Sequence, residues 1–109
     1  MPRISSRTTQ AGRKLNPVHP GEVLLLDFLR PMGISMYRLS KDTGISQQQI
    51  GRIVKGTRGI SGDVALRLAR YFGTSAQVWM GLQSRYDLDL AEDAAGAKIE
   101  KRVRPLRAA

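Results

Sequence analysis

Hydrophobic residues recur at helical spacing through the middle of this chain and predict five short helices. In each of five stretches the apolar positions fall three or four residues apart, and glycine or proline separates one stretch from the next. The stretches cover approximately residues 20–30, 36–43, 46–55, 61–72 and 75–93. The pattern therefore predicts an all-α fold.

The first predicted helix begins near Pro20 and runs to Arg30. Proline suits the first helical position because no hydrogen bond is lost there, and Pro31 and Gly33 are expected to end the helix. One side carries large apolar residues that we expect in the core: Leu24, Leu25, Leu26, Phe28, Leu29 and Met32.

Residues 39–56 organise the rest of the chain, because they predict two short helices joined by a tight turn. The first of these helices starts after Ser35, a residue well suited to an N-cap. Gly44 can adopt the left-handed conformation that ends a helix, and Ile45 then fills the corner. The inward positions of this helix would be Met36, Leu39 and Ser40. The arrangement is that of a helix-turn-helix.

The second helix of this pair has one apolar and one polar edge. Ser46 caps it, and Ile50 and Ile53 form the apolar edge. The polar edge consists of Gln47, Gln48, Gln49, Arg52 and Lys55. Amide and guanidinium groups on a short docked helix are the donors and acceptors that read bases in a major groove. We therefore interpret this edge as a candidate DNA-reading surface.

Two further helices follow the loop that carries Thr57 and Arg58. Ser61 and Ser75 cap them, and Gly73 separates them. In the fourth helix we expect Val64, Ala65, Leu68, Ala69 and Phe72 to lie in the core. In the fifth we expect Trp79, Leu82, Tyr86 and Leu90 to form core or a dimer surface.

The two ends of the chain differ from this helical domain, which we place at residues 17–93. Residues 1–16 show no apolar period and predict a flexible basic arm, which either touches phosphates or only keeps the chain in solution. Residues 94–109 predict either a short amphipathic helix or a frayed basic tail. The acidic residues before this tail are expected to form a solvated face: Asp87, Asp89, Glu92 and Asp93.

The charge of the chain points to a polyanionic partner. Eighteen lysines and arginines stand against nine aspartates and glutamates, which gives a formal charge of +9. Nucleic acid is favoured over a membrane surface, because the chain has neither a long apolar run nor a segment of signal-peptide type. We expect a soluble, cytoplasmic protein. The absence of cysteine and the single histidine, His19, leave little material for a metal, a cofactor or a histidine-based catalytic site.

Three runs of sequence resemble one family, the HigA antitoxins of bacterial toxin-antitoxin modules, which are Xre-type helix-turn-helix proteins. The runs are HPGEVLLLDFL (residues 19–29), RGISGDVALRLARYFGTS (residues 58–75) and VWMGLQSRYDL (residues 78–88). The resemblance implies a five-helix domain like that of phage repressors. It also implies a homodimer that binds a palindromic operator at its own promoter and sequesters a small basic mRNA endonuclease of the HigB/RelE type. Such a protein would associate with the nucleoid when bound to DNA.

The resemblance also assigns roles to single residues. Base contacts fall to Gln47, Gln48, Arg52 and Lys55, and contacts to the phosphate backbone fall to Gln49, Thr57 and Arg58. On the preceding helix, Arg38 and Lys41 lie where such a helix crosses the backbone, so each either contacts a phosphate or is simply solvated.

Two positions depart from the family pattern. Related proteins often have glutamine, which can hold a phosphate, where Met36 stands. Gly51 lies inside the reading helix, where glycine costs about 1 kcal/mol relative to alanine. It either allows a closer approach to DNA or only softens the helix.

Three other functions are alternatives to a DNA-binding antitoxin. The chain could be an interaction module that only neutralises a toxin through its acidic patch at residues 87–93, or a stand-alone regulator with no toxin partner. An enzyme would require a nucleophile or metal site around Asp89 and Glu92, and the neighbouring residues supply neither. We therefore expect no enzymatic activity.

Overall fold

The structure is a computed structural model, and it describes residues 17–107 of the 109. The described residues form helices, and they contain no strand. The chain divides into two compact units. The larger unit, Val18–Tyr86, holds the predicted helix-turn-helix, and the smaller unit includes the chain from Asp87 onwards. The flexible arm predicted at residues 1–16 lies outside the described residues.

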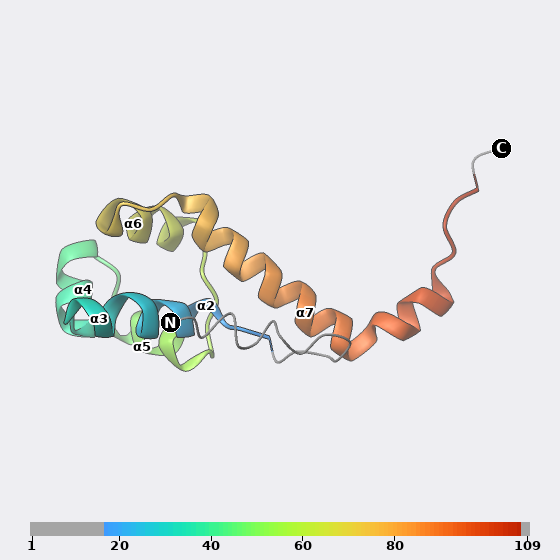
Figure 1. The fold of residues 1–109 in the computed structure, drawn as a ribbon, viewed down its shortest axis with the longest axis horizontal. Coiled ribbons are helices and arrows are strands. Elements are labelled where there is room, and N and C mark those ends of the chain that lie inside the picture. The colour runs from blue at the N-terminus through green and yellow to red at the C-terminus, as the bar shows by residue number, and fades with distance from the viewer. Residues whose placement is uncertain (1–16, 108–109) are drawn as a thin grey trace. The chain divides into compact units, whose positions relative to one another are not determined.

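The first predicted helix is one continuous helical rod whose middle turn is a π-helix. It consists of α2 (Pro20–Val23), η1 (Leu24–Leu29) and α3 (Arg30–Met32), and Gly33 ends it in the left-handed conformation (Figure 1). The rod therefore passes through Pro31, whereas the sequence predicts that the helix ends there. A proline ring clashes with the carbonyl four residues before it in a regular α-helix, and the wider π-turn immediately ahead of Pro31 gives that ring room.

The helix-turn-helix consists of α4 (Met36–Thr43) and α5 (Gln47–Lys55), as the sequence predicts. Ser35 and Ser46 cap them, because each hydroxyl accepts a hydrogen bond from the backbone N–H three residues later, at 3.0 and 3.1 Å. Gly44 ends α4 at a φ of 80°, a conformation that a side chain would strain. The caps thus fix both ends of the turn between the two helices.

The core of the larger unit combines residues from the π-turn of the first rod, from both helices of the helix-turn-helix and from the helices that follow it. Leu24, Leu39, Ile50, Ile53, Leu68 and Trp79 are at most 1% exposed. Trp79 lies against Phe28, with ring centroids 5.1 Å apart, and its indole N–H donates to the Thr74 hydroxyl at 2.8 Å. Two predicted core positions are wrong: Met32 and Met36 are 53% and 37% exposed. Both flank the turn at Gly33, where the rod ends.

The last two helices are α6 (Gly62–Phe72) and α7 (Ala76–Arg102). Within α6, Val64, Ala65 and Leu68 are buried as predicted, and Ala69 and Phe72 are partly buried against the core. The α7 helix extends beyond residue 93, through residues for which the sequence predicts either a short helix or a tail. Leu90, expected in core or a dimer surface, is 44% exposed.

Candidate DNA-binding surface

The α5 helix is anchored on one side and exposed on the other. Ile50 and Ile53 are 0% and 1% exposed in the core. The side chains of Gln47, Gln48, Arg52 and Lys55, predicted to contact bases, are all exposed. A helix held by its apolar edge presents the opposite edge in a fixed orientation, which groove recognition requires.

The exposed edge of α5 is positively charged. The helix contains no acidic residue, and it carries Arg52 and Lys55 in its last turns. Within residues 17–107, no carboxylate forms an ion pair with Arg52, Lys55 or Arg58. Their charges are therefore available to an anionic ligand. Gln49, predicted to contact a phosphate, is partly buried, so it is less accessible than Gln47 and Gln48.

The loop after α5 is held in place at both of its ends. Thr57 donates two hydrogen bonds to the Arg52 carbonyl, from its N–H at 2.9 Å and from its hydroxyl at 3.2 Å. The N–H of Ile60 donates to the side-chain oxygen of Gln83 at 2.6 Å. The exposed Arg58 lies between these two anchors. Although it is a loop residue, it therefore has a defined position relative to α5.

The α4 helix carries the other two predicted phosphate contacts, Arg38 and Lys41, and both are exposed. Arg38 makes a long contact of 3.4 Å with the Asp42 carboxylate, and Lys41 lies 5.8 Å from the centre of the Tyr37 ring. Both interactions are at the surface, where such pairs are worth less than about 1 kcal/mol. Either cation can therefore turn to a phosphate at little cost.

Two side chains of α6 hold the end of α4. The Arg67 guanidinium donates to the Thr43 carbonyl at 2.8 Å and pairs with Asp63 at 2.6 Å. The Tyr71 hydroxyl donates to Asp42 at 2.6 Å. This hydrogen bond lowers the pKa of Asp42, to which Arg38 also contributes, and raises the pKa of Tyr71. The two contacts fix the α4 terminus, from which the turn to α5 departs.

The N-terminus of α2 lies directly against the end of α5. A Cβ added at Gly21 would lie 1.7 Å from the carbonyl oxygen of Ile53, so the two backbones meet with no room for a side chain. His19 caps α2 by accepting a hydrogen bond from the Gly21 N–H at 2.9 Å, and its ring lies edge-on to Tyr86. The close contact between Gly21 and Ile53 fixes the distance between α2 and α5.

Sequence reasoning missed the residues that position the surface, namely Gly21, Gln83 and Arg67. Each of them acts on a partner at least 23 residues away in the sequence. Local periodicity and capping rules describe neighbours along the chain, so they carry no signal for such contacts. Only a folded arrangement brings these partners together.

The described residues contain no group of three or more histidine, aspartate and glutamate side chains placed to hold a metal ion. No helix in the described part of the chain is both long and apolar enough to cross a membrane.

Comparison with known proteins relates this chain to a family. The helix-turn-helix family model matches residues 25–79. Virulence-associated protein I of Dichelobacter nodosus is 48% identical over 75% of this chain and 77% of its own length. Antitoxin HigA-1 of Vibrio cholerae is 32% identical over 69% of this chain and 70% of its own length. The solved structure of Pseudomonas aeruginosa antitoxin HigA with the higBA promoter has a TM-score of 0.80, is 47% identical, and covers 84% of this chain and 99% of that one.

Proposed function

Since this chain belongs to the Xre-type helix-turn-helix family that includes the HigA antitoxins, we propose that it is the antitoxin of a toxin-antitoxin module. In this role it binds operator DNA as a dimer, represses its own promoter and neutralises a small basic mRNA endonuclease of the HigB/RelE type. The similarity to a HigA solved with promoter DNA supports the DNA-binding part of the proposal.

The observation that carries the proposal is the two-sided construction of α5. Its buried edge at Ile50 and Ile53 fixes the helix, and its exposed edge presents amides and cations without a single carboxylate. Glutamine can pair bidentately with adenine and arginine with guanine in the major groove, so Gln47, Gln48 and Arg52 are the residues that would read sequence. Lys55 would add charge at the end of the helix.

The residues around α5 would set its position on the duplex. Arg58, in the anchored loop, and Arg38 and Lys41, on α4, would contact phosphates. Phosphate contacts orient a protein on DNA without discriminating sequence. In a dimer, the two α5 helices would enter half-sites about 34 Å apart, which is one turn of B-DNA.

Titration of the protein on DNA from upstream of its own gene tests this assignment. We expect Arg52→Ala to lose roughly 1 to 3 kcal/mol on the operator and to bind scrambled DNA nearly as before, because the lost contact reads a base. Arg58→Ala should weaken both DNAs alike and reduce the salt dependence of binding. Arg70→Ala, which removes an exposed arginine from α6, is the matched control and should change neither.

The outcome of this titration can contradict the proposal directly. If Arg52→Ala keeps the wild-type ratio of operator to scrambled affinity, α5 does not read sequence through this residue. Fluorescence anisotropy at three or more salt concentrations separates this loss of specificity from a general loss of charge.

The toxin part of the proposal has a test of its own. A small basic toxin encoded beside this gene should co-purify with the chain. Co-expression of the chain should relieve the growth arrest that the toxin causes. If no such reading frame adjoins the gene, the chain is a stand-alone regulator, and the DNA-binding predictions still hold.

A further inference from the structure

Gly51 is a glycine that the fold of the described residues does not require. It lies in the interior of α5, where glycine is less stable than alanine. Its φ is not positive, so its backbone conformation suits any residue. A Cβ at this position would point into open space, with no neighbouring atom within 4 Å. Within residues 17–107, therefore, neither backbone conformation nor packing explains the glycine.

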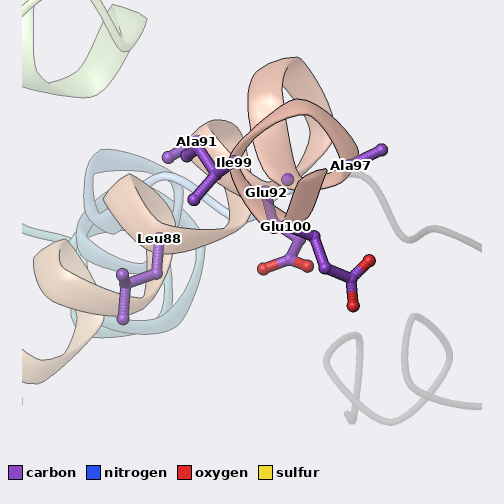
Figure 2. A pocket seen from close by; sticks show the side chains of 7 residues that line it. Leu88, Ala91, Glu92, Ala97, Ile99 and Glu100 are labelled. Atoms are coloured by element: carbon purple, nitrogen blue, oxygen red, sulfur yellow. The ribbon is translucent and has the colours of Figure 1, made fainter. Parts of the chain in front are cut away.

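Other glycines of the chain have a packing reason that Gly51 lacks. At Gly21 a Cβ would lie 1.7 Å from a backbone carbonyl oxygen of α5. Gly96 is one of the residues that line the hollow in Figure 2, where a Cβ would lie 3.1 Å from a carboxylate oxygen of Glu92. Gly81, inside α7, shares the open surroundings of Gly51 and so provides a matched control.

Gly51 lies on the exposed edge of α5, among the residues proposed to read bases. Residues three and four apart on a helix are neighbours, with Cβ atoms about 5 to 6 Å apart. Gly51 is therefore adjacent to Gln47, Gln48 and Lys55. At about 100° per residue, it falls between Gln47 and Gln48 around the helix axis, one turn further along. Its missing side chain leaves a notch in the surface that these longer side chains form.

A thymine methyl group is the feature of a base pair that fits such a notch. Among the four bases only thymine carries a methyl group, and this group projects into the major groove. Glutamine pairs with adenine, so Gln47 or Gln48 would bring the notch alongside an A·T pair. The Cα of a glycine offers no hydrogen bond, so the notch suits an apolar group better than a polar base edge.

We propose that the notch at Gly51 receives the C5-methyl group of an operator thymine, in the volume that an alanine Cβ would occupy. Gly51 then contributes to specificity by shape, whereas Gln47, Gln48 and Arg52 contribute by hydrogen bonds. This assignment rests on the proposed function. It accounts for a residue that weakens a helix in the middle of the helix proposed to read DNA.

Gly51→Ala tests the notch, because it should change stability and DNA affinity in opposite directions. Alanine favours the helix, so the Tm should rise. Affinity for the operator should fall at least about fivefold, because the added methyl group meets that of the thymine. Gly81→Ala makes the same substitution inside α7. It should raise the Tm and keep operator affinity within about twofold of the wild type.

Operator DNA with uracil in place of thymine tests the occupant of the notch, since uracil lacks only the methyl group. Each thymine is replaced in turn, together with its symmetry-related partner, and affinity is measured by fluorescence anisotropy. At one position the wild type should lose about fourfold, which is the value of one buried methyl group. On that DNA, Gly51→Ala should bind within about twofold of the wild type, because the clash is removed.

Three results would overturn the assignment. The first is an operator affinity of Gly51→Ala equal to or above that of the wild type. The second is a loss at Gly51→Ala that uracil relieves at no position, and the third is an equal loss for Gly51→Ala and Gly81→Ala. The proposed function fails separately, if Arg52→Ala keeps the wild-type ratio of operator to scrambled affinity whatever the effect of Gly51→Ala.

Discussion

The contact between Gly21 and Ile53 makes the position of α5 sensitive to a single methyl group. Gly21→Ala would place a Cβ 1.7 Å from the Ile53 carbonyl oxygen and 2.6 Å from its carbon, whereas such contacts are essentially never shorter than 3.0 Å. The obstacle is backbone and not a flexible side chain. The start of α2 and the end of α5 must therefore move apart by at least about 1.3 Å.

The energetic cost of this movement follows from what it disrupts. Inserting a methyl group into a packed contact typically costs about 1 to 3 kcal/mol, and the upper end applies because neither backbone can rotate away. For a domain of this size, about 3 kcal/mol lowers the Tm by roughly 12 to 24 °C. Under the proposed function, operator affinity should fall as well, because the displaced residues belong to the helix proposed to read bases.

Gly51→Ala is the matched control, and we expect it to raise the Tm where Gly21→Ala lowers it. A Cβ at Gly51 meets no atom within 4 Å, and this glycine lies in the middle of α5. Alanine in a helix is more stable than glycine by about 0.5 to 1 kcal/mol, so the Tm should rise by roughly 2 to 8 °C. Thermal denaturation followed by circular dichroism measures both variants. If Gly21→Ala melts within about 2 °C of the wild type, the close contact between α2 and α5 is wrong.

Two further predictions concern contacts that position the surface. Gln83→Ala should destabilise the domain by about 1 to 3 kcal/mol in chemical denaturation, because the N–H of the buried Ile60 loses its acceptor, and Gln83→Glu, which keeps an acceptor oxygen, should lose less. Tyr71→Phe should lower the Tm at neutral pH and progressively less as the pH falls below 3.8. The Tyr71 hydrogen bond lowers the pKa of Asp42 in the folded state. The stabilisation from this bond is therefore present above the pKa of Asp42 in the unfolded chain and is lost when Asp42 is protonated. A Tm difference that does not depend on pH would contradict this linkage.

The sequence predicts the helix-turn-helix well because its signals are local. Ser35 and Ser46 cap helices within three residues of themselves, and Gly44 ends α4 by its own backbone conformation. The burial of Ile50 and Ile53 follows from helical spacing. Each of these inferences needs only residues within one or two turns, and the structure confirms them all.

The remaining features depend on partners that local rules do not identify. Met36 has the spacing of a core residue, but its exposure depends on whether another helix reaches that corner. The rod passes Pro31 because a π-turn intervenes, and no residue of that turn signals it. The sequence leaves residues 94–109 open between a helix and a tail; α7 continues to Arg102, because residues 94–97 are rich in alanine and contain no breaker strong enough to stop helix propagation.

If α5 reads bases as proposed, the arrangement of contacts separates the stability of this domain from its choice of DNA sequence. Three contacts hold α5 and its surroundings without using its exposed edge. Gly21 packs against the end of α5, Gln83 binds the loop that follows it, and Arg67 binds the end of α4 before the turn. Surface substitutions that touch no such contact usually change stability by less than about 0.5 kcal/mol. Gln47 and Gln48 can therefore be exchanged for other polar residues with little effect on folding, while each exchange alters the donors and acceptors offered to a base pair. Under the proposed function we therefore expect that substitutions in α5 alone can change operator preference, provided that the contacts at the two ends of α5 are kept.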